Sequence, residues 1–404
     1  MKKILLSAIA IAAMTQSASA YDSLGEALQN GTYSTKARVF FFDRSFDKKG
    51  KDDAVALTAG GIMKYQSGSF YGLKTGLAYY GSHRLGGLYS RNEGKGTSIL
   101  GRAGEDISFL GEAYLEYCFC ETGLTNTTVK VGRQQLSTPL IQNHDLRILP
   151  SVYEAAVISN KDIVDTNLEL GYIQAYSGFT SKDHSFKDQN TNWGKDGLGY
   201  VSVKNKSIPN LSIRAQYVMP MNDKDDAGKQ VKIADYKYVD AKYALPFGEK
   251  TYIKAQYGAN AYNVGEDSLL YGVKAGTSFG MFDIAVLHDT VADNAFKAVE
   301  SGPMYSDWQQ GYGPYEPSTA LGAQIVAHPM AGLSLKAGYV MVEADEDFRA
   351  DNTFTDDFTE MNIDAKYALT DYSKIRIRYS IKDQSDDSDR EDRDDFRIIY
   401  YLNF

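Results

Sequence analysis

Basic and apolar side chains alternate along residues 373–382, which have the sequence SKIRIRYSIK. Successive side chains of an extended strand point to opposite faces. Lys374, Arg376, Arg378 and Lys382 therefore share one face, and the isoleucines share the other. Ammonium and guanidinium groups in a row attract carboxylates and other small anions. The pattern predicts an anion-attracting strand face rather than a catalytic centre.

Signals for catalysis or metal binding are weak. No histidine stands at a metal-ligand spacing from another; the five are His83, His144, His184, His288 and His328. No serine motif resembles a nucleophile elbow. We expect no metal, no cofactor and no enzymatic activity. Cys118 and Cys120 would lie about 6.5–7 Å apart in an extended strand, at the limit for a disulfide, so we expect free or loosely paired thiols.

The composition limits the class of protein. The 404 residues are 43% hydrophobic and 24% charged, with a net charge of −9 and 2 cysteines. This balance excludes a disordered chain and a disulfide-stapled scaffold, and it argues against nucleic acid as a partner, because phosphates require a basic surface. After residue 20, no apolar run reaches the roughly 18 residues of a membrane-spanning helix. A helical membrane protein is excluded, but a β-barrel is not.

Residues 1–20 have the pattern of a secretory signal peptide. Lys2 and Lys3 precede an apolar stretch, and Ala18-Ser19-Ala20 forms a small-residue cleavage site. We therefore divide the chain into a signal peptide, residues 1–20, and a mature domain, residues 21–404. The mature chain is expected to be exported into the periplasm and beyond.

The mature chain contains 18 segments of about ten residues in which apolar and polar side chains alternate, the signature of strands with two different faces. Short turns and long polar connections largely alternate between them, with one exception at 264–267. Transmembrane β-barrels have short periplasmic turns and long outer loops. The predicted fold is all-β: a closed antiparallel transmembrane barrel of about 18 strands.

The aromatic residues support this fold. Many of the 30 tyrosines fall near predicted strand ends, where a membrane interface favours them. The last strand carries an apolar stripe that ends in an aromatic residue: Phe396, Ile398, Tyr400, Leu402 and Phe404. This stripe resembles the signal by which the barrel assembly machinery recognises outer-membrane barrels.

Residues 131–158, VGRQQLSTPLIQNHDLRILPSVYEAAVI, resemble the signature of the Opr-type (OprD-like) outer-membrane porins. The resemblance implies a substrate-selective channel of 18 strands, in which this segment folds into the pore and basic side chains form a ladder along the wall. The chain departs from the family pattern at Ala155-Ala156, where the family usually has glycine, and at His144.

Strand parity assigns the pore-lining residues, since a charge facing the bilayer midplane would cost roughly 2–4 kcal/mol. The predicted basic track comprises Lys36, Arg38, Lys366, Lys374, Arg376, Arg378 and Arg397. The connection 134–151 is poor in acidic residues and rich in apolar ones, which suits an inward constriction loop presenting Asn143, His144, Asp145 and Arg147. The alternative is an ordinary polar porin wall whose cations are neutralised by acidic partners.

These features predict a passive channel of the Gram-negative outer membrane for small water-soluble solutes, favouring anionic or carboxylate-bearing nutrients. The alternatives are a structural or adhesive barrel and, with less support, a barrel enzyme. Expected partners are solutes, outer-membrane lipid with lipopolysaccharide, and the assembly machinery; the sequence leaves monomer and homotrimer open. The acidic runs 344–357 and 383–393 suit solvated loop tips, or less simply sites for divalent cations.

Overall fold

The computed structural model describes residues 21–47, 53–85, 90–91, 106–123, 125–143, 147–178, 186, 194–225, 228–300, 302–306, 316–345, 356–385 and 392–404. One antiparallel sheet of 18 long strands and the two-residue β4 dominates this part of the chain. The strands are β1 (Thr32–Phe46), β2 (Ala54–Gln66), β3 (Leu73–Arg84), β4 (Ser90–Arg91), β5 (Ile107–Cys118), β6 (Thr127–Gln134), β7 (Val152–Asn160), β8 (Thr166–Ser177), β9 (Leu198–Asn205), β10 (Leu211–Pro220), β11 (Ile233–Ala244), β12 (Glu249–Tyr262), β13 (Ser268–Phe279), β14 (Phe282–Ala292), β15 (Ser318–Met330), β16 (Leu333–Ala344), β17 (Phe358–Ala368), β18 (Ser373–Gln384) and β19 (Arg393–Asn403).

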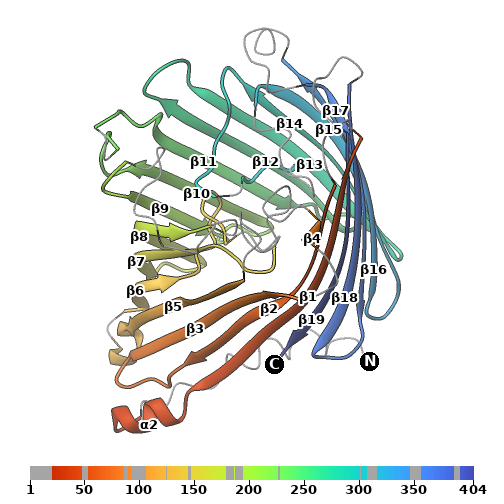
Figure 1. Cartoon of the computed structure of the whole chain (residues 1–404). Coiled ribbons are helices and arrows are strands. Elements are labelled where there is room, and N and C mark those ends of the chain that lie inside the picture. The colour runs from red at the N-terminus through yellow and green to blue at the C-terminus, as the bar shows by residue number, and fades with distance from the viewer. Residues whose placement is uncertain are drawn as a thin grey trace.

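The sheet closes on itself. β1 pairs with β2 on one side and with β19 on the other, so the red and blue ends of the chain lie together in Figure 1. Backbone groups in lipid must be paired, and closure removes the sheet edges. Each of the 18 predicted segments coincides with a long strand, which confirms the predicted barrel. The extra strand β4 lies in the connection between β3 and β5 and pairs with β2.

The two faces of the strands meet different surroundings. In β11, Tyr236, Tyr238 and Asp240 point inward and are buried, whereas Val239 and Tyr243 point outward and are exposed. In a membrane these outward side chains contact lipid, so apolar residues are stable there without a protein partner. Alternation along the sequence thus becomes an apolar outer surface and a polar interior.

The connections are sorted between the two ends of the barrel. Short turns such as 206–210, 245–248 and 369–372 define what we call the short-turn end, and the opposite end is the long-loop end. The connection 263–267 is short at the long-loop end, as the sequence predicts. The six-residue helix α2 (Leu24–Gln29) lies at the short-turn end, where the Ala27 carbonyl accepts a hydrogen bond of 2.8 Å from Gly68 N.

No helix in the described ranges is long and apolar enough to cross a membrane.

The expectation of free or loosely paired thiols is wrong in this structure. Cys118 and Cys120 form a disulfide, with their Cα atoms 5.1 Å apart. The chain leaves the extended conformation at this point and enters a short 3-10 helix, Phe119–Thr122. This bend brings the two Cα atoms closer than an extended strand allows.

Candidate pore site

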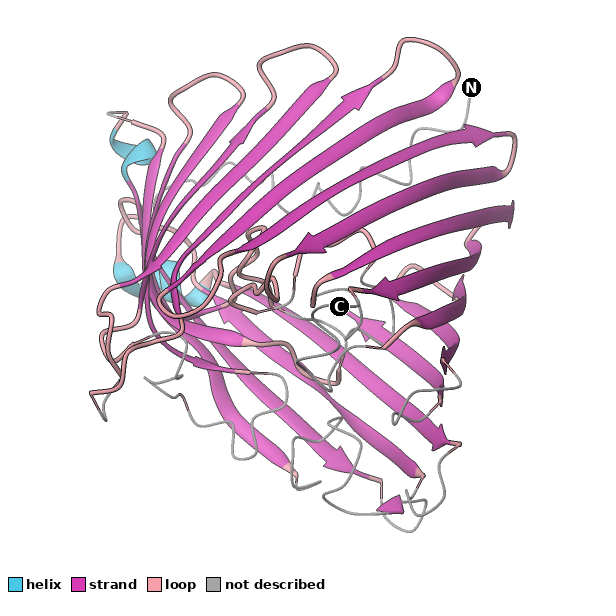
Figure 2. Cartoon of the chain, turned by 90° about the horizontal axis from the view of Figure 1, so that it is seen from above, coloured by secondary structure: helices cyan, strands magenta, loops and turns pink. Residues whose placement is uncertain are grey.

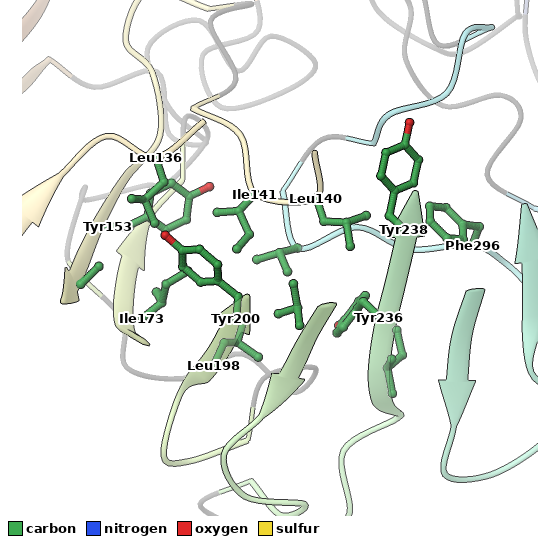
Figure 3. Close-up of a cluster of buried hydrophobic side chains, with 14 of the residues drawn as sticks. Leu136, Leu140, Ile141, Tyr153, Ile173, Leu198, Tyr200, Tyr236, Tyr238 and Phe296 are labelled. Carbon is green, nitrogen blue, oxygen red and sulfur yellow. The ribbon is translucent and has the colours of Figure 1, made fainter. Parts of the chain in front are cut away.

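Two connections fold into the barrel and pack against its inner wall. Leu136, Leu140 and Ile141 belong to the first, and Phe296 and Val299 belong to the second. Figure 3 shows side chains of both connections meeting inward residues of the strands, and Figure 2 shows loop segments inside the ring of strands. The wall residues of this cluster come from the long-loop halves of β7–β14: Tyr153, Ala155, Val157, Ile173, Leu198, Tyr200, Val218, Ile233, Tyr236, Tyr238, Leu270 and Val291.

Polar groups fix the first connection in place. The side-chain oxygen of Gln216 on β10 accepts a hydrogen bond of 2.7 Å from Leu140 N, and its amide nitrogen donates one of 2.8 Å to Thr138 Oγ1. Leu140 and Ile141 are fully buried. Apolar burial and satisfied backbone groups together explain why this segment stays inside the barrel.

The second inward connection, 293–306, was not predicted. It pairs with the first through a parallel bridge between Ile141 and Glu300, and Ser151 Oγ donates a hydrogen bond of 2.9 Å to Glu300 Oε1. Burial raises the pKa of Glu300 to about 7, although the Ser151 hydrogen bond opposes that shift. The signal was present in the sequence, because Phe296, Val299 and Met304 are apolar like the residues that identified 134–151.

The predicted constriction residues are only partly within the described chain. Asn143 Nδ2 donates a hydrogen bond of 3.0 Å to Gln135 Oε1, and the Arg147 carbonyl accepts one of 2.8 Å from the Arg38 guanidinium. His144 and Asp145 lie outside the described residues. Arg38 therefore joins the predicted basic track directly to the inward connection.

The residues of the predicted basic track lie together on one wall. Lys366 on β17 stands opposite Arg376 on β18, and Arg378 stands opposite Arg397 on β19. β19 pairs with β1, which carries the remaining two members, Lys36 and Arg38. Lys374 precedes Arg376 on the same face of β18. The strand register thus brings two cations from the start of the mature chain together with five from its last 40 residues.

Asp364 and Asp395 are among the carboxylates that bind arginines of this wall. Asp364 accepts hydrogen bonds from Arg376 Nε at 2.9 and 3.0 Å, and its Oδ2 lies 3.7 Å from Arg378 Nε. Asp395 is fully buried and accepts two hydrogen bonds from Arg44, at 2.7 and 2.9 Å, and one from Arg397, at 2.6 Å. We call the inward arginines of β1, β18 and β19 the arginine wall: Arg38, Arg44, Arg376, Arg378, Arg393 and Arg397.

Phe42 stacks with three guanidinium groups at the centre of this wall. The guanidinium carbons of Arg397, Arg44 and Arg147 lie 4.6, 5.0 and 5.6 Å from its ring centroid. Phe42 is fully buried. An aromatic face stabilises a nearby cation, so this ring and Asp395 together hold the arginines in fixed positions. The sequence analysis did not identify Phe42, Asp395 or Arg44 as members of the site.

Among the described residues, no group of three or more His, Cys, Asp or Glu side chains is placed to hold a metal ion. The chemistry that these residues offer is electrostatic, since they fix several positive charges on the inner wall, although Arg44, Arg378 and Arg397 are themselves buried.

Comparison with known proteins agrees with this architecture. The family model described as "outer membrane porin, OprD family" matches residues 27–400. OpdO of Pseudomonas aeruginosa superposes with a TM-score of 0.73 at 15% identity, covering 94% of this chain and 98% of its own. OpdK of the same organism, determined with vanillate, gives 0.75 at 16%, covering 93% and 99%. OccAB1 of Acinetobacter baumannii gives 0.73 at 14%, covering 96% and 99%. No curated protein sequence matches this chain.

Proposed function

The chain belongs to the OprD family of outer-membrane porins, and from this premise we propose that it passes small anionic solutes, above all carboxylates, into the periplasm of a Gram-negative cell. The observation that carries the proposal is the row of inward cations on β17, β18, β19 and β1. Their common wall gives a diffusing anion successive binding partners. The OpdK structure was determined with vanillate, which is itself a carboxylate.

The inward connections provide the narrow part of the proposed route. Apolar residues of 134–143, 293–300 and 302–306 pack against β7–β14. Ile148 and Leu149 of the first connection pack instead beside Phe42 on the arginine-wall side. The first connection therefore crosses the lumen, and the solute route narrows where it approaches the arginine wall. In this arrangement Arg147 and Arg38 lie where the connection meets the wall. Asn143, His144 and Asp145 remain proposed members of the constriction.

Orientation and export follow from the same proposal. The short-turn end faces the periplasm, as in other membrane barrels, and residues 1–20 are removed during export. Phe404 is recognised by the barrel assembly machinery, a role supported by its place beside β1: its backbone N–H donates a hydrogen bond of 3.0 Å to the Thr35 carbonyl, while 63% of the residue is exposed.

Reversal potentials in planar bilayers under a KCl gradient test the proposed selectivity. We expect an anion-selective wild-type channel. The double variant Arg376→Ala plus Arg378→Ala should shift the reversal potential toward cations, because it leaves Asp364 without its arginine partners. Lys237→Ala is the matched control, since Lys237 is on the outward face of β11 and should change nothing. A cation-selective channel that the double variant leaves unchanged would contradict the proposal.

A further inference from the structure

A second group of cations lies on the wall formed by β9–β13, away from the arginine wall. Lys204 stands directly opposite Arg214, Lys242 opposite Lys254, and Lys254 opposite Lys274. We call the four lysines, Lys204, Lys242, Lys254 and Lys274, the lysine wall. All four lie in the short-turn halves of their strands. They are therefore nearer the short-turn end than the apolar cluster that holds the inward connections.

Like charges placed directly opposite on neighbouring strands destabilise a sheet. Among the described residues, none of these four lysines forms an ion pair, whereas Lys64 and Lys237 each do. Two neighbouring repulsive pairs remain, Lys242–Lys254 and Lys254–Lys274, because Asp240 neutralises the Arg214 guanidinium that lies opposite Lys204. A bound anion would remove this repulsion.

The lysine wall borders a cavity of about 600 Å³ that opens into the lumen. Five basic side chains and one carboxylate line it; the basic ones are Lys204, Lys206, Arg214, Lys242 and Lys254. The carboxylate, Asp240, is already engaged: Arg214 Nε donates to it at 2.9 and 3.1 Å, and the Tyr238 hydroxyl donates at 3.0 Å. The remaining lysines thus face the cavity with their charge uncompensated.

A hydrogen-bonded network next to this cavity positions two of its lining residues, Asp240 and Tyr305. The Tyr238 hydroxyl also lies 3.0 Å from Gln256 Oε1, and the Gln256 amide donates a hydrogen bond of 2.7 Å to Asp289. Asp289 in turn accepts hydrogen bonds of 2.7 Å from the backbone and the hydroxyl of Ser306. Ser306 therefore anchors the second inward connection and places Tyr305 at the cavity, with its ring 5.9 Å from Lys254 Nζ.

We propose that this cavity is a binding site for small oxyanions that carry two or more negative charges, such as phosphate esters or polycarboxylates. A monovalent carboxylate would leave most of the lysine repulsion in place, whereas a multivalent anion reaches several ammonium groups at once. Lysine suits such a site because its flexible stem allows its ammonium group to follow a moving solute. The proposal rests on the chain forming an open channel.

Single-channel block of the full chain in planar bilayers tests the site. Citrate, pyrophosphate and acetate are added in separate experiments to each side of the membrane in turn. We expect citrate or pyrophosphate, or both, to interrupt the current from the side of the short-turn end, and acetate to do so only at far higher concentration. Block by citrate alone would assign the site to polycarboxylates, and block by pyrophosphate alone would assign it to phosphates. Increasing KCl should weaken the block, because salt screens these charges.

The decisive variant is Lys242→Gln plus Lys254→Gln, which removes two charges from the cavity. We expect its half-blocking concentration to rise by about tenfold or more. The matched control, Lys232→Gln plus Lys237→Gln, also removes two lysines, but these are exposed side chains near the long-loop end that belong to neither wall, so it should stay within about twofold of the wild type. Heat-modifiable migration on electrophoresis verifies that both variants form barrels.

The outcomes separate the two proposals. If the folded barrel conducts no current, the proposed channel function is contradicted, and the proposed binding site is contradicted with it. A conducting, anion-selective channel that multivalent anions do not block, or that acetate blocks equally well, would overturn the site alone. Equal block of the Lys242→Gln plus Lys254→Gln variant and the wild type would also overturn it.

Discussion

The arginine wall and the lysine wall both present cations to the lumen, but the surroundings of the cations differ. Arg376 and Arg397 donate hydrogen bonds to Asp364 and Asp395, and Arg397 also stacks on Phe42. Lys242 on β11 and Lys254 on β12 stand directly opposite each other on neighbouring strands, with no described carboxylate bound between them. Guanidinium groups form planar, directed contacts, whereas ammonium groups are compact and strongly hydrated. The first wall has fixed geometry, and the second has excess charge.

This difference suggests a division of roles along the pore. On the arginine wall, buried carboxylates neutralise part of the charge and determine where each guanidinium lies. On the lysine wall, the described carboxylate Asp240 is held by Arg214, so the lysines act mainly through their electrostatic field. The function of a wall therefore depends less on how many cations it carries than on how many of those cations are bound by carboxylates.

The largest expected effect comes from removing the buried carboxylate of the arginine wall. Asp395→Asn removes the buried negative charge to which Arg44 and Arg397 both donate hydrogen bonds. Breaking such a buried network should lower the free energy of unfolding by about 3–5 kcal/mol. Urea unfolding of the refolded barrel in lipid vesicles measures it. Asp394→Asn, at the next position on the outward face, is the control and should cost less than about 1 kcal/mol; equal losses would contradict the assignment of Asp395.

Exchanging the two basic residue types between the walls tests the same difference. Arg397→Lys removes the planar contact with Phe42 and the directed hydrogen bond to Asp395, and should cost about 1–3 kcal/mol. Lys254→Arg should change the free energy of unfolding by less than about 0.5 kcal/mol, because its ring contacts with Tyr252 and Tyr305 are long and remain available to a guanidinium. Similar losses in both variants, measured by the same urea unfolding, would show that the two walls do not differ in this way.

Much of this structure follows from alternation in the sequence. Residues such as Arg376 and Arg378 could be placed on the inner wall because Ile375 and Ile377 must face lipid, and this parity needs no knowledge of neighbouring strands. The partners of the arginines were harder to predict. Asp395 shares the parity of Arg397, but its contact with Arg44 depends on the pairing of β1 with β19, which joins opposite ends of the chain.

The connections were predicted less well than the strands. The segment 134–151 has a high apolar content throughout, whereas Phe296, Val299 and Met304 are diluted among polar residues of a longer connection. Their burial depends on contact with Leu140 and Ile141, two residues of another connection. The bend at Cys118–Cys120 is likewise a local departure from the extended conformation that strand periodicity does not contain.

The inward connections cover part of the lysine-wall side of the lumen, so a change in their docking should affect that side first. Glu300 joins the two connections and has a pKa of about 7, raised by burial. Its neutral form is favoured in the docked structure, so docking weakens as the pH rises from the ordinary carboxyl pKa through about 7, and the full penalty is present above that value. We expect more current noise at pH about 8 than at about 5.5.

The Glu300→Gln variant should remove this pH dependence. Glutamine retains an oxygen that can accept the hydrogen bond from Ser151, but it carries no charge at any pH. Noise spectra of the wild type and Glu300→Gln at both pH values measure the effect. Glu266→Gln, an exposed carboxyl on the neighbouring connection, is the control and should behave as the wild type. Equal pH dependence in the wild type and Glu300→Gln would assign the noise to another group.

The smallest expected effect on conduction concerns the disulfide at the short-turn end. It lies at the end of β5, a strand between the two walls in the order of the sheet. Cys118 and Cys120 are two residues apart, and cross-links that close short loops restrict the unfolded chain little, so the double serine variant should lose no more than about 1–2 kcal/mol. Its reversal potential and its block by citrate should equal those of the wild type. Lys130 lines the same cavity as this disulfide, so a changed reversal potential would mean that the cross-link positions a third group of pore cations, and the comparison of two walls would then be incomplete.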